Sequence, residues 1–222
     1  MKGCESELRW LDAPARADHV FLVDSDQCAY LSQYAAGQGY QGGHCNQLMR
    51  NFKCAPSIAR GNPRRANYKR RAINTLAQWL RRAVTQAQAE RWTWVPIPPS
   101  KHRGDPDFDD RLSSTLSLAF EGYDLDLRRV LCQSQSTARD HAGGTRLPEE
   151  ALYRILQIDL EALEQRPLRE RVVLFDDMLT SGKHYKCCER RLRECLPHVP
   201  VMGVFLSRRA PTRSDRSLGR AW

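Results

Sequence analysis

The sequence lacks the features that would place the chain in a membrane or outside the cell. No run among the 222 residues approaches the roughly 20 consecutive apolar residues that a membrane-spanning helix needs. The first 19 residues contain neither an apolar core nor a small-residue cleavage pattern, so they do not form a signal peptide. We therefore expect a soluble cytoplasmic protein without a membrane partner, in which the eight cysteines are most simply free thiols.

Acidic residues are also scarce relative to basic ones. The chain contains 35 lysines and arginines against 26 aspartates and glutamates, which gives a formal net charge of +9. Such an excess indicates an anionic partner, and nucleic acid, nucleotide phosphates and pyrophosphate all fit it. The 41 % of hydrophobic residues are spread along the chain, which excludes disorder of the whole protein.

The pattern of apolar residues changes at residue 64. Residues 1–63 are irregular and rich in glycine, whereas helical and strand patterns alternate over 64–209, and a basic tail follows at 210–222. The alternation predicts an α/β protein with a parallel sheet, whose ligands bind beyond the carboxyl ends of the strands. The expected helices cover 64–91, 107–120, 148–165 and 182–195, and the expected strands cover 92–99, 125–132, 171–177 and part of 198–209.

The segment 171–185 carries the strongest chemical signal. Val172–Phe175 predicts a buried strand, which ends in Asp176 and Asp177 and is followed by a short turn, Met178–Lys183. Backbone N–H groups in such a turn, hydroxyl side chains and the start of the next helix favour a phosphate. Because two carboxylates would repel that phosphate, they must serve another part of the ligand, such as ribose hydroxyls or Mg²⁺.

The stretch VVLFDDMLTSG resembles the phosphoribosyl-pyrophosphate (PRPP) motif of type I phosphoribosyltransferases. The resemblance implies the type I phosphoribosyltransferase fold, a mostly parallel twisted sheet flanked by helices, with residues 1–63 as a variable hood or partner-binding segment. It implies that Asp176 and Asp177 hold the ribose hydroxyls and, indirectly, Mg²⁺ as the cofactor. The implied 5-phosphate site consists of Met178, Leu179, Thr180, Ser181, Gly182 and Lys183.

Two upstream segments extend this resemblance. The loop that follows the strand 92–99 stands where the family binds pyrophosphate, and the polar stretch 133–148 stands where it has a flexible lid, loosely similar to that of the ComF-type subgroup. The implied pyrophosphate ligands are Ser100, Lys101, His102 and Arg103, and the implied lid residues are Ser136, Thr137, His141 and Arg146. Lys101 and Arg146 join the two aspartates as the expected catalytic residues.

The implied reaction is transfer of the phosphoribosyl group to a nitrogen acceptor with release of pyrophosphate. Thr180 stands where members that use 6-oxopurines carry aspartate, which argues against hypoxanthine or guanine as the acceptor. In an alternative hypothesis the protein has the same fold but does not catalyse the transfer. It would be a regulator or toxin-like effector in competence or phage defence that binds PRPP or nucleotides. Members of the family often form homodimers.

A third hypothesis concerns the basic helix expected over 64–91. Its basic residues could form a surface for nucleic acid or a nucleoprotein, with Trp79 or Tyr68 available for stacking, or simply a solvated face. These residues are Arg64, Arg65, Lys69, Arg70, Arg71, Arg81 and Arg82. We interpret the glycine-rich stretch 37–42 as a loop, because no clear strand precedes it, and we expect Cys187 and Cys188 to pack in the core.

Overall fold

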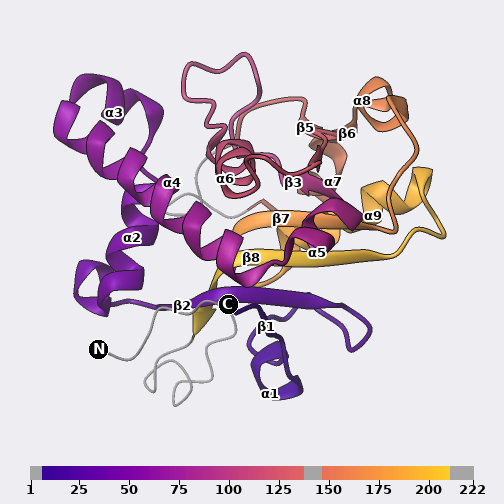
Figure 1. Ribbon diagram of the computed structural model, residues 1–222, viewed down its shortest axis with the longest axis horizontal. Helices are drawn as coiled ribbons and strands as arrows, with labels where there is room; N and C mark the ends of the chain where they lie inside the picture. The colour runs from indigo at the N-terminus through magenta and orange to yellow at the C-terminus, as the bar shows by residue number, and fades with distance from the viewer. Residues whose placement is uncertain (1–6, 138–146, 211–222) are drawn as a thin grey trace.

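The central sheet of the computed structural model has six strands in the order β1-β2-β8-β7-β3-β4 (Figure 1). The structure describes residues 7–137 and 147–210. All neighbouring strands in this sheet are parallel except β1, which runs antiparallel to β2. The strands are β1 (Arg9–Trp10), β2 (Cys28–Ala35), β3 (Trp92–Pro96), β4 (Asp126–Leu127), β7 (Arg171–Leu179) and β8 (Val201–Ala210). The expected α/β class with a mostly parallel sheet is thus confirmed.

Helices cover both faces of this sheet and create two apolar cores. On one face α4 (Pro63–Ala83) packs with α2 (His44–Phe52) and α6 (Arg111–Ala119), over a core in which Trp94 contacts Phe120 and Phe175. On the other face α9 (Lys183–Cys195) packs with α7 (Glu149–Ile155). The shorter helical segments are α1 (Ala13–Arg16), η1 (Gly39–Gly42), α3 (Pro56–Gly61), α5 (Gln86–Arg91) and α8 (Leu160–Glu164).

β7 lies in the middle of the sheet because its sequence suits burial on both faces. Val172, Val173, Leu174 and Phe175 are each at most 1 % exposed, and β7 pairs with β3 on one side and β8 on the other. A continuous apolar run is typical of a central parallel strand. This position carries the two aspartates, which end the run, to the carboxyl edge of the sheet.

Three expected elements are divided in the structure. The helix expected over 64–91 breaks into α4 and α5, because Thr85 and Gln88 form a capping box that starts a new helix. The strand expected over 125–132 breaks into β4 and β5 (Leu131–Gln133) around the buried side chain of Arg128. The helix expected over 148–165 becomes α7, β6 (Leu156–Ile158) and α8, because β6 pairs with β5 in a small antiparallel sheet.

The N-terminal segment contains a strand that the sequence analysis did not predict. β2 lies between β1 and β8, and its residues Cys28, Ala29 and Leu31 are almost completely buried. Residues 28–35 are thus part of the main sheet. Residues 211–222 of the expected tail lie outside the described residues. Within the described ranges, no helix combines the length and apolar character that crossing a membrane requires, and no two cysteines form a disulfide.

Candidate functional site

The strand order reverses between β3 and β7. From β3 the chain continues through α6 to β4 on one side, and it later returns to β7 on the other side. α6 lies on one face of the sheet, whereas α9, which follows β7, lies on the opposite face. β3 and β7 stay paired as far as Ile97, whose N–H donates to the carbonyl of Phe175 (2.8 Å). Open α/β sheets bind ligands in the crevice beyond such a reversal.

The turn after β7 requires glycine at position 182. Gly182 has a φ of +85°, and a Cβ atom there would lie 2.8 Å from the side chain of Leu22. The left-handed backbone ends β7 and starts α9, a helix of 13 residues that opens at Lys183. Met178 and Leu179, expected in the turn, are the last two residues of β7 and pair with β8. The turn itself consists of Thr180, Ser181 and Gly182, and α9 begins directly after it.

Residues 19–22 cover the outer side of this turn. The N–H of Phe21 donates to the carbonyl of Ser181 (3.0 Å), and the His19 ring bonds through Nδ1 to the carbonyl of Thr180. These contacts use carbonyl oxygens of the turn, whereas a phosphate would bind its N–H groups. Burial, together with nearby Arg208, lowers the pKa of His19 below its ordinary value. Among the described residues its Nε2 atom has no hydrogen-bond partner.

The two aspartates at the end of β7 have opposite electrostatic environments. Asp177 is 4 % exposed and accepts from Lys53 Nζ (2.9 Å) and from the Arg111 guanidinium. Burial alone would raise its pKa, but these two cations lower the pKa of Asp177 far below its ordinary value. Asp176 is partly buried, and burial with the charge of Asp177 raises its pKa to about 7.

The ion pairs continue from Arg111 into a buried network. Arg111 also donates to Asp109 (2.8 Å), which accepts from Lys69 of α4 (2.6 Å). The sequence analysis did not identify Lys53, Asp109 or Arg111 as site residues. The only local signal is the acidic stretch before α6, which a favourable interaction with the helix dipole explains equally well. A lone lysine in an irregular segment carries no signal of its own.

This donor set does not fit a Mg²⁺ ion bound directly by the aspartate pair. Both oxygens of Asp177 already accept hydrogen bonds from cationic groups, and one oxygen of Asp176 accepts from the N–H of Asp177 (2.7 Å). Within the described ranges, no group of three or more histidine, cysteine, aspartate or glutamate side chains is arranged to hold a metal. We therefore derive no step through a metal held by these residues.

The expected pyrophosphate loop and the start of the expected lid contact each other directly. The N–H of Thr137 donates to the carbonyl of Ser100 (2.7 Å), and the N–H of His102 donates to the hydroxyl of Ser136 (3.2 Å). That hydroxyl in turn donates to Asp105 (2.5 Å), which lies 3.6 Å from Lys101 Nζ. The two segments therefore form one structure at the crevice. His141 and Arg146, the other expected lid residues, lie outside the described residues.

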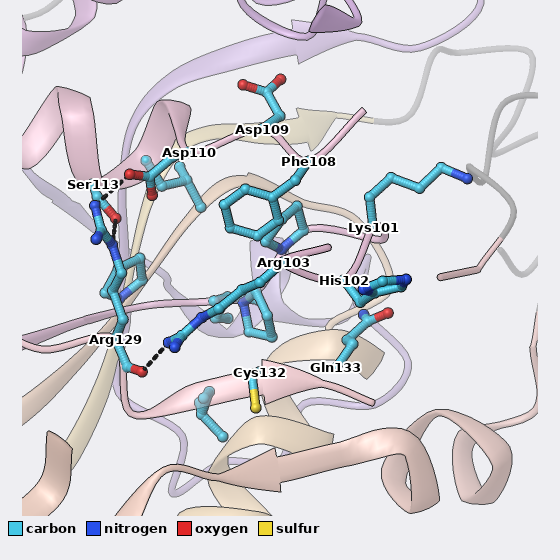
Figure 2. Close-up of a pocket in the computed structure, with 16 residues that line it drawn as sticks. Lys101, His102, Arg103, Phe108, Asp109, Asp110, Ser113, Arg129, Cys132 and Gln133 are labelled. Carbon is cyan, nitrogen blue, oxygen red and sulfur yellow. Dashed lines mark hydrogen bonds and ion pairs between the residues drawn. The ribbon is translucent and has the colours of Figure 1, made fainter. Parts of the chain in front are cut away.

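Arg103 points away from the other residues of the loop. Figure 2 shows its side chain reaching the carbonyl of Arg129 (2.9 Å), and its guanidinium lies 3.5 Å from Asp159. Beside it, a small hollow, partly open to solvent, lies between the loop and the start of α6. The ring of Phe108 and the prolines of the loop line this hollow, so it combines apolar walls with cationic groups.

The basic residues expected on one helix surface have different environments. Lys69 is largely buried in the ion-pair network and donates to the carbonyl of Cys54. Arg81 donates to the carbonyls of Ala119 and Glu121 after α6, so it has a structural role. Trp79 is 8 % exposed and packs in the core, which removes it as a stacking residue. The exposed members are Arg64, Arg65, Arg70, Arg71, Arg81 and Arg82.

Comparisons with known proteins do not assign this site. No protein-family model matches the chain, and no curated protein matches it. The interpretation of the site therefore depends on the residues and their geometry.

Proposed function

We propose that the crevice between β3 and β7 binds PRPP, and that the protein transfers the phosphoribosyl group to a nitrogen acceptor. The observation that carries the proposal is the meeting of two segments at this crevice. The turn 180–183 and the loop 97–103 follow the adjacent strands β7 and β3 at the reversal of strand order. We further propose that the sheet is the type I phosphoribosyltransferase fold, which the strand content and this placement of the motif support.

In this proposal each segment holds one part of PRPP. The N–H groups of the turn bind the 5-phosphate, and the ionised carboxylate of Asp176 accepts from a ribose hydroxyl. Lys101 neutralises the charge that grows on pyrophosphate as the C1–O bond breaks, while the acceptor nitrogen forms the C1–N bond and loses its proton. Catalysis then comes from positioning and charge stabilisation without a covalent intermediate, and a Mg²⁺ ion bound to the pyrophosphate would supply further neutralising charge.

Asp177 acts in this scheme mainly through Lys53 and Arg111. Its side chain is 5 % exposed and Arg111 is 14 % exposed, whereas Lys53 is 28 % exposed at the edge of the network. A ribose hydroxyl can reach Asp177 only by sharing it with Lys53 or displacing it. Lys53 therefore links the N-terminal segment to the ligand site.

The same ion pairs support a second candidate function. A carboxylate already paired with two cations suits a site that binds its ligand without turning it over. The protein would then be a regulator or toxin-like effector that binds PRPP or a nucleotide.

Release of pyrophosphate from PRPP, measured with a panel of nitrogenous bases, tests the transferase directly. We expect Lys101→Ala and Asp177→Asn to lower turnover by at least about 100-fold, because loss of one such contact costs about 3 kcal/mol of barrier. Circular dichroism and thermal unfolding check that each variant is folded, since Asp177 also belongs to the buried ion-pair network. Arg154→Ala is the matched control: Arg154 forms an ion pair with Glu150 of the same length, 3.6 Å, but lies on α7 and is exposed.

The outcomes separate the two candidates. Acceptor-dependent release that both site variants lose supports the transferase. PRPP binding without release across the panel contradicts the transferase and supports the second candidate. Unchanged PRPP affinity in both site variants contradicts the assignment of the site.

A further inference from the structure

All of the net positive charge of the protein comes from one stretch of chain. Residues 27–89 contain no aspartate or glutamate and ten lysines and arginines, whereas the other 159 residues contain 25 basic and 26 acidic residues. A solvated surface normally mixes both signs of charge. A stretch of 63 residues without one acidic side chain therefore calls for an explanation beyond solubility.

The fold gathers most of this stretch into one group of helices. α2 and α3 both pack against α4, and Figure 1 shows the three together beside the sheet. Acidic groups from other segments neutralise the two lysines, since Lys53 pairs with Asp177 and Lys69 with Asp109. The remaining charge belongs to arginines. Of these, Arg50, Arg64, Arg65 and Arg71 are exposed and have no acidic partner among the described residues.

Two exposed tyrosines lie among these arginines. Tyr40 is 41 % exposed, and it lies beneath the Arg50 guanidinium (4.4 Å to the ring centre) and accepts from Arg65 through its hydroxyl (3.1 Å). Tyr68 is also 41 % exposed, on α4. Arg64 and Arg71 stand four residues before it and three residues after it, so all three share one helix face.

We infer that this surface binds single-stranded nucleic acid. We call it the basic face and define it by Arg50, Arg64, Arg65, Arg71, Tyr40 and Tyr68. Guanidinium groups bind backbone phosphates, and tyrosine rings between them offer platforms on which unpaired bases stack. A duplex hides the faces of its bases, and an acidic protein offers no bases, so the tyrosines favour a single strand over both.

The inference does not depend on the proposed activity of the crevice. The basic face lies on α2, α4 and the segment before α2, and none of its six residues belongs to the turn 180–183 or the loop 97–103. If PRPP does not bind, the inference about the basic face still stands. If nucleic acid does not bind, the proposed function of the crevice still stands.

Fluorescence anisotropy with labelled strands of about 20 nucleotides tests the inference. The probes are single-stranded RNA, single-stranded DNA, a duplex of the same sequence and polyglutamate of similar charge, each at about 50 and 200 mM salt. We expect both single strands to bind more tightly than the duplex and polyglutamate. The ratio of RNA to DNA affinity then shows which single strand is preferred.

The decisive variants separate charge from its position. Arg64→Gln/Arg65→Gln/Arg71→Gln should weaken single-strand binding at least tenfold and reduce the slope of log K against log salt by about 2. The matched control, Arg91→Gln/Arg154→Gln/Arg190→Gln, removes the same charge from exposed arginines that each have a glutamate partner. It should bind like the wild type.

Tyr68→Ala tests the base-stacking part of the inference. It should weaken single-strand binding by about fivefold or more with an unchanged salt slope, because stacking involves no counterion release. Circular dichroism confirms that each variant is folded. Equal losses in the two triple variants, or duplex or polyglutamate binding as tight as that of single strands, would overturn the inference.

Discussion

The crevice and the basic face both contain several cations, but the cations have different surroundings. At the crevice Lys53, Lys69 and Arg111 share Asp177 and Asp109 in a largely buried network. On the basic face the arginines are exposed and have no acidic partners among the described residues. Buried ion pairs are costly to break, whereas exposed charges contribute little to stability and remain available to a ligand. Burial and pairing therefore indicate which charges hold the fold and which are free to bind.

The largest effect expected from this comparison follows removal of a buried carboxylate. Asp109→Asn should lower the free energy of unfolding by about 3 kcal/mol or more, because Lys69 and Arg111 lose the carboxylate that they share. Asp110→Asn is the control: its side chain is 37 % exposed and, within residues 7–137 and 147–210, forms an ion pair only with the exposed Arg129. It should cost under about 1 kcal/mol. Urea unfolding measures both, and equal costs would show that burial does not separate the two pairs.

The next effect separates backbone strain from crowding at the turn. Gly182 and Gly122 have nearly the same φ, +85° and +83°, but only Gly182 has a neighbour that an added Cβ would meet. Gly122→Ala should cost about 1–2 kcal/mol of unfolding free energy from strain alone. Gly182→Ala should cost about 1–3 kcal/mol more, because Leu22 must move.

A double variant provides the internal check on that crowding. In a Leu22→Ala background, Gly182→Ala should cost no more than Gly122→Ala does. A cost that persists in the double variant would mean that Leu22 does not limit the turn.

The raised pKa of Asp176 predicts that its substitution stabilises the protein, unlike the substitutions above, and that the gain depends on pH. Since its pKa is about 7 in the folded protein and 3.8 ordinarily, the folded state loses stability as the pH rises through that window. Asp176→Asn removes this loss. The variant should gain stability relative to the wild type between pH 4 and pH 7, by about 1–2 kcal/mol after allowance for partial solvent exposure, and the gain should level off above pH 7.

Thermal unfolding at several pH values measures this gain. A difference between wild type and variant that stays constant over the window would show that Asp176 is not strained by its surroundings. PRPP binding should follow the same ionisation and strengthen as the pH rises through 7, because an ionised carboxylate accepts a hydrogen bond from a ribose hydroxyl more strongly than the neutral acid does.

The smallest effect on stability is expected on the basic face. Arg64→Gln/Arg65→Gln/Arg71→Gln should change the free energy of unfolding by no more than about 0.5 kcal/mol, because these exposed side chains have no acidic partner among the described residues. Urea unfolding of this triple variant and of Asp109→Asn under the same conditions compares the two free energies of unfolding directly. A loss comparable to that of Asp109→Asn would show that the basic face stabilises the fold.

The elements that the sequence predicted well are those with strong local signals. The apolar run 172–175 and the basic amphipathic pattern after Lys183 correspond to β7 and α9 within a few residues. β6 was missed, and β5 was not separated from β4, because β5 and β6 each have three residues and depend on pairing with each other. β2 was missed because it lies in an irregular segment and forms by pairing with β8, about 175 residues later.

The candidate site shows the same division between local and distant determinants. The turn after β7 was predictable because the small residues and Gly182 that form it belong to one short segment. Lys53 and Arg111 were not, because they lie 124 and 66 residues from Asp177 in sequence and only the fold brings them together. The pKa values of the two aspartates depend on these partners. The motif alone therefore could not predict that the pKa of Asp176 is raised while that of Asp177 is lowered.

Calorimetric titration of the intact protein with PRPP and Mg²⁺ tests the central claim most directly, because the proposed transferase requires this ligand at the crevice. The account predicts binding of one PRPP per chain, which strengthens as the pH rises from 6 to 8 and is lost in Asp177→Asn but not in Arg154→Ala. Absence of heat, together with an unchanged melting temperature at millimolar PRPP, would contradict it.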